Sequence, residues 1–595
     1  MNTRSALDTP LRLRIRWPAP VPDGQCDNFF VGAWHPSRSI AIDWTDSSNN
    51  KLSIARLSGR NWFLASATAP RNGAGLVHRT DSGGGIAFRG YVLPDVHSYS
   101  QSAAIHKCWL DTTSARNGVF SAAVIGRDGA SLTLATDLLG MGTLYWRRLG
   151  EIVLFATNPR YLACPDDEPD RLAWRYLVQT SWIGADRSLT AGIGRVPAGC
   201  AMTFAGGGEP VTSPPAWRLL PEGGKRIDSQ TLDEVEHAFQ QSLDRCLRLR
   251  SGSVMLPLSS GFDSRRILAG LVRRKTGFTA VTCRVLQQGN RDLDARFARQ
   301  MAQDFGFPHR VVDATDRQYQ SDDVSRRALT DSETGYHTWA CRVFSTLPDA
   351  CEVIFDGIGG DILGDPVGWR ATIGLGLATG DRTDEEEIKS IAVYAIKSDF
   401  DGVLAPARWP TAENLRDDLR GYLRTLRPRA NLGELAFLLL RQRRAIALWS
   451  QQLPPPGVVP LYPYLDADYL RVVLALSSED KNTTKLQRAC LNKFFPEFLR
   501  YGGNRDIPSD MPLGSPDREL GRRLRCLEQL RLELEQAGAT AEVRELLALK
   551  GRLALAVSGP MPALALRWSW YLQPLMELVS QQARRIPVWD LMGAP

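Results

Sequence analysis

Residues 254–270 limit the folds open to this chain more than any other stretch. A short apolar run from Val254 to Leu258 meets a turn of small residues at 259–264, and apolar residues then recur at the spacing of one helical face. Those recurring residues are Ile267, Leu268, Leu271 and Val272. The pattern predicts a buried strand, a tight loop and a helix, in that order.

The loop at 259–264 has the composition of an anion-binding turn. Its Ser-Ser-Gly run lets backbone N–H groups turn inward, and the following helix presents the positive end of its dipole, so both would bind a phosphate. Asp263 would repel that phosphate unless a divalent cation lay between them, and Mg²⁺ is the usual partner of phosphate oxygens. The loop therefore predicts Mg-ATP. The alternative is an ordinary turn in which Asp263 or Ser264 caps the helix.

The Gly-Lys-Ser/Thr ending of the P-loop is absent. The loop instead resembles the pyrophosphate loop of the asparagine synthetase family, Ser-Gly-Gly-x-Asp-Ser, with Ser260 in place of the first of the two glycines. That resemblance implies a domain of the PP-loop ATP pyrophosphatase type, with ATP and Mg²⁺ as cofactors. It assigns ATP binding to Leu258, Ser259, Ser260, Gly261, Phe262, Asp263 and Ser264.

Strand and helix patterns alternate around this loop. An amphipathic helix is expected at 232–248, strands at 278–285, 309–313 and 351–355, and a further helix at 293–305. This alternation predicts a doubly wound parallel sheet, in which ligands bind at the carboxyl ends of the strands.

A glycine-rich segment, residues 356–364, follows the last of these strands and carries Asp361. Its place at the carboxyl edge of the sheet puts it beside Asp263, so the two aspartates are expected to hold Mg²⁺ together. The segment resembles the family's Gly-x-Gly-(Ala/Gly)-Asp element, and we expect Gly359 and Gly360 to contact ATP. Ile358 stands where family members often have Glu or Tyr to help deprotonate the incoming amine, so no general base is assigned.

The chain from residue 11 to about residue 215 consists mainly of short alternating segments, such as 12–17 and 37–43, divided by Gly, Pro, Asn and Ser. An antiparallel, β-rich domain is the plain inference. Within it, three strands with turns between them are expected at 117–125, 132–145 and 150–157.

These three segments, together with residues 193–199, resemble the glutaminase-type half of asparagine synthetase-like proteins. The resemblance implies an Ntn-hydrolase-like sandwich of the class II glutamine amidotransferase kind, so the whole chain is expected to combine an α+β and an α/β domain. We expect these domains at 1–215 and 231–595, the second with a helical extension. Residues 216–230, rich in Pro, Gly and Glu, form the expected linker.

The residues that hydrolyse glutamine in that family have no clear counterpart here. Glutamine-using members place a cysteine directly after the initiator Met, where its own α-amino group is the base for its thiol. Position 2 is Asn2, and Cys26 would reach that role only after a cleavage behind Gln25. No Arg-Gly-Pro-Asp segment is present either. The first domain is therefore expected to be degenerate, without glutamine hydrolysis.

The last third of the chain is helical and rich in Arg, most clearly at 435–448 and 469–476. Residues 460–466 resemble the family's Arg-x-Pro-Phe-Leu-Asp element, and residues 485–488 resemble its Lys-x-x-Leu-Arg. The family next places a catalytic lysine that stabilises charge as the adenylate forms and collapses. Arg505 is the cation at that point of this chain, and it either serves that role or is a surface-loop arginine.

Composition narrows the classes of function. The net charge is +7 over 595 residues and the arginines are scattered, so nucleic-acid binding is not expected. Ten cysteines without a Cys-x-x-Cys pair or regular spacing indicate neither a zinc site nor a disulfide framework, and they fit a reducing cytoplasm. With no signal-peptide pattern and no apolar run of membrane-spanning length, a cytoplasmic protein without membrane contact is expected.

The resemblance implies a ligase that activates a carboxylate. That carboxylate would attack the α-phosphate of ATP, pyrophosphate would leave, and an amine would displace AMP, with Asp263, Asp361 and Arg505 as the catalytic residues. The missing cysteine and the altered base and lysine segments favour the branch that closes β-lactams or lasso-peptide macrolactams, which brings a precursor peptide and a maturation protease as partners. The alternatives are an asparagine synthetase that uses ammonia, and a non-catalytic scaffold that keeps the fold.

Overall fold

A computed structural model describes most of the chain, and the description below is confined to those residues. They are 10–16, 29–45, 53–68, 76–93, 117–249, 252–285, 292–335, 337–348, 350–364, 384–396, 409–426, 430–455, 457–502, 516–537, 544, 548, 562–585 and 587–592. Asn2, Cys26 and Arg505 lie outside the described residues, so what the sequence predicts for them stays a prediction.

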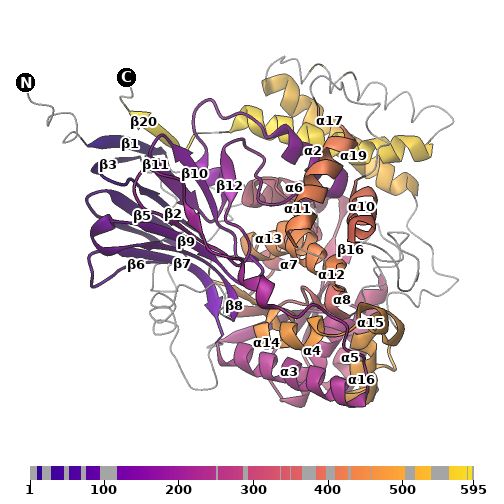
Figure 1. Cartoon of the computed structure of the whole chain (residues 1–595). Helices are drawn as coiled ribbons and strands as arrows, with labels where there is room; N and C mark the ends of the chain where they lie inside the picture. The colour runs from indigo at the N-terminus through magenta and orange to yellow at the C-terminus, as the bar shows by residue number, and fades with distance from the viewer. Residues whose placement is uncertain are drawn as a thin grey trace, which may run out of the picture.

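A sandwich of two antiparallel six-stranded sheets forms the first half of the fold (Figure 1). One sheet has the order β12 (Ile193–Arg195), β10 (Tyr145–Leu149), β11 (Ile152–Ala156), β2 (Phe29–Trp34), β5 (Trp62–Thr68), β4 (Ser53–Ser58). The other has the order β14 (Val211–Thr212), β13 (Ala201–Phe204), β9 (Leu132–Thr136), β8 (Gly118–Ile125), β7 (Gly85–Val92), β6 (Val77–Arg79). Apolar side chains from the inner faces of both sheets share one buried cluster, which confirms the predicted β-rich sandwich.

Two details of this half differ from the sequence prediction. The segment expected to be one strand at 132–145 holds β9 and then a loop, because the buried Asp137 carboxylate accepts N–H groups of Phe120, Leu139, Met141 and Gly142 and so turns the chain. In addition, β1 (Leu11–Arg16) pairs in parallel with β3 (Ile40–Thr45) and antiparallel with β20 (Trp589–Met592) from the far end of the sequence. These three strands make a separate small sheet.

The predicted parallel sheet is present and has five strands. Their order is β17 (His309–Ala314), β16 (Thr279–Val285), β15 (Ser253–Pro257), β18 (Cys351–Phe355), β19 (Val459–Leu461), and every pair is parallel. The helices that accompany it are α3 (Ser229–Arg248), α4 (Phe262–Arg273), α5 (Asp292–Phe305), α6 (Asp316–Thr330) and α7 (Trp339–Ser345). Together with the sandwich, this sheet confirms the two-part fold class. The short strand β19 was not predicted.

The helical extension follows this sheet. Its elements are α8 (Gly360–Gly364), α10 (Asp384–Ala395), α11 (Ala412–Thr425), α12 (Leu432–Phe437), the π-helix η7 (Leu438–Ile446), α13 (Ala447–Gln452), η8 (Pro463–Leu465), α14 (Ala467–Leu474), α15 (Ser478–Thr484), α16 (Leu486–Phe494), η9 (Pro496–Phe498), α17 (Pro516–Ala537) and α19 (Pro562–Arg584). The helix expected at 435–448 is thus an α, π and α run. None of the helices in the described ranges is both long and apolar enough to span a membrane.

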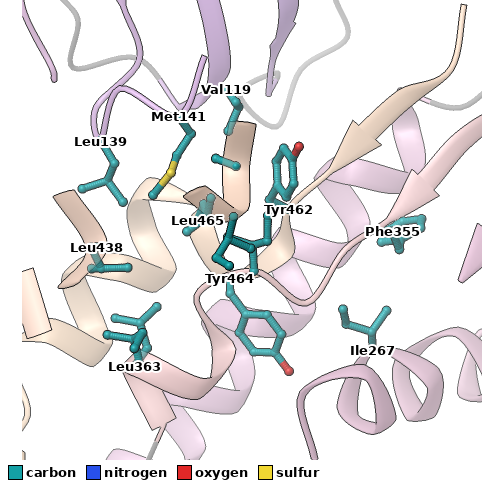
Figure 2. Close-up of a cluster of buried hydrophobic side chains, with 14 of the residues drawn as sticks. Val119, Leu139, Met141, Ile267, Phe355, Leu363, Leu438, Tyr462, Tyr464 and Leu465 are labelled. Atoms are coloured by element: carbon teal, nitrogen blue, oxygen red, sulfur yellow. The ribbon is translucent and has the colours of Figure 1, made fainter. Parts of the chain in front are cut away.

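The largest buried apolar cluster runs from the sandwich into the parallel sheet. Figure 2 shows Leu139 and Met141 from the sandwich above Leu438 and Leu465 from the helical extension. A second cluster joins α17 and α19 to α2 (Arg171–Thr180). The expected linker begins with a short turn, Ala216–Leu219. Its Trp217 is buried in the largest cluster, which joins the sandwich to the parallel sheet. The domain boundaries at 215 and 231 remain predictions.

Candidate nucleotide-binding site

The loop between β15 and α4 leaves the first turn of α4 without a side-chain cap. Gly261 is the N-cap residue, with extended backbone angles and no side-chain hydrogen bond. Asp263 therefore lies in the first helical turn rather than at the cap, and the Ser264 hydroxyl lies 3.1 Å from the Ser259 hydroxyl inside the loop. The first N–H groups of a helix have no partner within it, and they carry its positive end. An anion would find donors here.

Ser260, which stands at the position of a family glycine, is hydrogen-bonded to the neighbouring helix α5. It is fully buried, and its backbone N–H and hydroxyl both donate to Oδ1 of Asp294 on α5, with the backbone bond at 2.8 Å. The hydroxyl therefore points into the protein and occupies none of the space in front of the α4 terminus. This contact explains how the loop accommodates a side chain at that position.

Arg265, on the first turn of α4, connects the loop to the C-terminal third of the chain. Its guanidinium is fully buried and donates to the carbonyl of Ser260 at 2.7 Å. The same group donates to the carbonyls of Tyr501 at 2.9 Å and Gly502 at 2.7 Å. Gly502 comes three positions before Arg505 in the sequence. The chain that leads to Arg505 thus starts beside the loop.

The glycine-rich segment after β18 packs directly against Asp263. A Cβ atom at position 360 would lie 2.6 Å from Cγ of Asp263, and one at position 357 would lie 3.4 Å from its Cβ. Gly359 has φ of +88°, a conformation that a residue with a side chain adopts only with strain. The close approach of the two segments therefore depends on glycine at these positions.

Asp361 follows this approach and is more open to solvent. Its side chain is 55% exposed, its Oδ1 accepts a hydrogen bond from Nε2 of Gln442 at 3.0 Å, and Nη1 of Arg441 lies 3.8 Å from its Oδ2. No group of three or more His, Cys, Asp or Glu side chains suited to a metal occurs in the described ranges. Mg²⁺ usually takes one or two carboxylates together with phosphate oxygens and water, so Asp263 and Asp361 fit it as ligands that need a bound phosphate.

Asp356, the other aspartate of the glycine-rich segment, lies at the same strand end, as its position after β18 predicts. Its carboxylate accepts a hydrogen bond from the Ser450 hydroxyl at 2.8 Å and from the Ile358 N–H at 3.0 Å. Burial raises the pKa of Asp356 to about 6, and these two hydrogen bonds oppose the rise. Ile358 is 4% exposed and packs in the large core cluster, so its side chain takes no part in proton transfer.

Two further residues, for which the sequence predicts no role, form hydrogen bonds with the backbone of the two loops. The hydroxyl of Tyr464, drawn in Figure 2 near Leu363 and Ile267, donates to the carbonyl of Asp263 at 2.9 Å. Burial and the neighbouring Asp263 raise the pKa of Tyr464 well above its ordinary value, so it remains a donor. Gln487 donates to the carbonyl of Gly360 at 3.1 Å. Both lie in segments that resemble family elements, but the sequence pattern alone does not say what they contact.

Comparison with known proteins gives a match at the level of sequence families. Residues 234–369 match the family model of asparagine synthase. No curated protein matches the chain. Of the loop residues described above, those from Leu258 to Ser264 and from Asp356 to Asp361 lie inside the matched region.

Several solved structures resemble parts of the chain. Glutamine phosphoribosylpyrophosphate amidotransferase from B. subtilis, complexed with ADP and GMP, is 8% identical over 48% of this chain and 81% of its own, with a TM-score of 0.21. NMN synthetase from Francisella tularensis is 15% identical over 36% of this chain and 94% of its own, with a TM-score of 0.19. A U34-tRNA thiolase from Methanococcus maripaludis with its [4Fe-4S] cluster is 12% identical over 36% and 78%, again at 0.19.

TM-scores this low carry no argument about the fold or the function of this chain. The candidate site contains the uncapped start of α4, the glycine segment packed on Asp263, and Asp361. Residues 234–369 match the family model of asparagine synthase, and both loops of the candidate site lie inside that match.

Proposed function

We propose that the protein adenylates a carboxylate with ATP and transfers the acyl group to an amine. In the first step a carboxylate oxygen bonds to the α-phosphorus of ATP, and the bond from that phosphorus to the bridging oxygen breaks to release pyrophosphate. In the second, the amine nitrogen bonds to the acyl carbon, AMP leaves with the former carboxylate oxygen, and the nitrogen loses a proton. The products are an amide, AMP and pyrophosphate.

The observation that carries this proposal is the packing of Gly360 on Asp263 at the uncapped start of α4. The backbone amides of that helix end would bind the pyrophosphate portion of ATP, and the buried Arg265 would keep the loop in shape. Mg²⁺, held by Asp263 and Asp361, would offset the negative charge of the leaving pyrophosphate. Arg505 is proposed to add a cation there, because the chain three residues before it is bonded to Arg265.

The amine is proposed to belong to the same molecule as the carboxylate, as in the lactam-closing branch that the sequence resembles. The eight cysteines of the described part are all buried, and burial raises the pKa of Cys164 and Cys200 in the sandwich to about 11. A thiol of that kind does not supply the thiolate needed to take ammonia from glutamine. A peptide substrate, with a precursor peptide and a maturation protease as partners in a reducing cytoplasm, fits this proposal.

Pyrophosphate release from Mg-ATP by the purified full chain tests the proposal. The substrate arms are aspartate with ammonium, aspartate with glutamine, and peptides that carry both a free amine and a side-chain carboxylate. Release with a peptide, accompanied by loss of one water mass from that peptide, is the expected result. Release with aspartate and ammonium alone would instead identify an asparagine synthetase.

Two aspartate variants supply the control. Asp263→Asn should abolish release, because it removes the carboxylate beside Gly360. Asp244→Asn should leave release unchanged, because Asp244 is half exposed on α3 and pairs with Arg274 away from the loop. No release from the folded wild-type protein in any arm would contradict the proposal and leave the scaffold alternative.

A further inference from the structure

The π-helix η7 places four consecutive polar residues, 441–444, in a buried run of the helical extension. A π-helix is rare and usually a single-turn feature, often found at functional sites, whereas this one extends over nine residues. Gln442, Arg443 and Arg444 are all buried. Three buried polar side chains in succession are costly unless each has partners, so their partners show what the helix connects.

The sandwich holds Arg443 from several directions. The guanidinium is fully buried and donates to the carbonyl of Val196 at 2.7 Å and of Gly140 at 3.2 Å, and it pairs with Asp186 at 2.6 Å. Arg195, on β12, donates in turn to the carbonyl of Arg443 at 3.2 Å. Both the side chain and the main chain of Arg443 are therefore tied to the sandwich.

Gln442, the preceding residue, faces the candidate metal site. It is 2% exposed, and its Nε2 donates to Oδ1 of Asp361 at 3.0 Å. Its Oε1 is buried and has no hydrogen-bond partner among the described residues. An unsatisfied buried acceptor destabilises a fold, so a glutamine in this position is poor for stability alone. The contribution of Gln442 at this position is its hydrogen bond to Asp361.

From these contacts we propose that the sandwich orients Asp361 through the π-helix, with Gln442 as the positioning residue. The connection runs from Gly140, Asp186 and Val196 to Arg443, then along one peptide unit to Gln442, and from its amide to Asp361. Gln442 holds Oδ1 of Asp361, and Oδ2, which lies 3.8 Å from Nη1 of Arg441, remains to bind the metal. The inference rests on the proposed function, because it takes Asp361 as a ligand of Mg²⁺, and it gives a sandwich without glutaminase chemistry a role in the ligase site.

The same helical run offers a matched control. Gln452, at the end of α13, is 1% exposed and also donates through its amide, to the Thr143 hydroxyl at 2.7 Å and the Thr157 carbonyl at 3.0 Å. It joins the helices to the sandwich, and its hydrogen bonds in the described part of the chain go to the sandwich rather than to Asp361. Gln442→Met and Gln452→Met therefore remove comparable buried amides, and the first alone removes the proposed positioning contact.

The experiment measures metal binding without turnover. Mn²⁺ serves as the probe metal, an α,β-methylene analogue of ATP as the unreactive nucleotide, and the electron paramagnetic resonance signal of free Mn²⁺ as the readout. Gln442→Met should raise the Mn²⁺ concentration at half saturation about 10-fold, as expected when a partner that orients a metal ligand is lost. Nucleotide affinity at saturating metal should stay close to wild type, and Gln452→Met should match wild type in both. A Gln442→Met protein with wild-type metal dependence would overturn the proposal.

A second variant tests the part played by the sandwich. Asp186 is 31% exposed, and asparagine has nearly the same size and shape as aspartate. Asp186→Asn therefore removes the ion pair with Arg443 at a position outside the site. We expect weaker Mn²⁺ binding and faster hydrogen exchange in peptides covering 357–364. Glu209→Gln, at an exposed ion pair of the sandwich, is the control. Unchanged binding and exchange in Asp186→Asn would overturn the coupling across domains. Wild-type protein that binds neither Mn²⁺ nor the analogue would refute the proposed function as well, whereas failure of the variants alone would refute only this inference.

Discussion

Two adjacent buried arginines at the start of α4 hold the loops of the candidate site in place through hydrogen bonds. Arg265 and Arg266 are both fully buried, and neighbouring positions on a helix point in different directions. Arg265 bonds the phosphate-type loop to the chain around Gly502. Arg266 pairs with Glu236 at 2.8 Å and donates to Gln487 at 2.8 Å, and Gln487 in turn holds Gly360. Each loop of the site is thus linked to one buried guanidinium.

Replacement of Arg265 should weaken nucleotide binding more than it weakens the fold. Arg265→Met leaves the Ser260 carbonyl without its donor, and we expect an affinity for Mg-ATP about 10-fold lower, because small displacements of binding groups have large effects. Arg265→Lys should recover only part of the loss, since an ammonium lacks the planar fork that spans several carbonyls. Isothermal titration calorimetry measures both. Arg273→Met, on the same helix but exposed, is the control, and full recovery by lysine would contradict the geometric argument.

Asp356 should give the fold a measurable pH dependence. Its pKa is raised from 3.8 to about 6, so between these values the folded chain binds more protons than the unfolded chain. The free energy of unfolding contributed by Asp356 therefore falls as pH rises through this window. Asp356→Asn resembles the protonated form and lacks that fall. The stability of the variant relative to wild type should increase by about 2 kcal/mol from pH 4 to pH 7.5, as measured by urea unfolding. A pH-independent difference would contradict the assignment.

At the scale of elements, the site depends on how closely α8 approaches α4. Gly360 begins α8, and its backbone lies against the Asp263 carboxyl group, so any side chain at 360 would force the two helices apart or displace Asp263. The buried Gln487 and Tyr464, on other elements, hold both loops in this position. The distance between α8 and α4 is therefore set by the contact of Gly360 with Asp263 and by the hydrogen bonds from Gln487 and Tyr464.

Gly360→Ala should abolish pyrophosphate release while the protein remains folded. The added Cβ would lie 2.6 Å from Cγ of Asp263, well inside contact distance, and Asp263 is the residue that must move. Gly421→Ala is the matched control, because Gly421 lies within α11 with open space around its Cβ position. That control should keep full activity and gain up to about 1 kcal/mol of stability from higher helix propensity. Wild-type activity in Gly360→Ala would show that the close approach is not needed.

At the scale of the whole molecule, strands from near the beginning and near the end of the sequence meet on the sandwich. Figure 1 shows β20 beside β1, and their register pairs Trp589 with Ile15. Trp589 is fully buried in the cluster beneath the first six-stranded sheet, and its indole N–H donates to the carbonyl of Tyr161 at 2.7 Å. The last described strand of the chain is therefore part of the core of the first domain.

Trp589→Ala should accordingly destabilise the sandwich by about 3–5 kcal/mol, the usual cost of removing a large buried aromatic side chain. Urea unfolding gives the size of the effect, and hydrogen exchange in peptides from β2 and β11 locates it. Met592→Ala, on the same strand but only half-buried, should cost much less. Loss of protection confined to the helical extension would contradict this assignment of the strand to the sandwich core.

The sequence was sufficient wherever neighbouring residues decide the outcome. The β15–loop–α4 unit, the strands β16, β17 and β18, and the helices α3 and α5 follow from hydrophobic period and turn chemistry, which act over a few residues. The order of these elements implies a parallel sheet, and a sheet of that kind brings the ends of β15 and β18 to one edge. The meeting of Asp263 with the Gly360 segment was therefore within reach of sequence reasoning.

Contacts between distant segments required the folded structure. Gln442 and Asp361 are 81 positions apart, Arg265 and Gly502 are 237 apart, and β1 and β20 lie at opposite ends of the sequence. Local periodicity carries no information about such pairs, because a buried Arg or Gln reads as polar until its partner is known. The π-helix could not be predicted for the same reason, because residues 438–446 have an ordinary helical pattern. The contacts of Arg443 with the sandwich and of Gln442 with Asp361 arise only through tertiary packing.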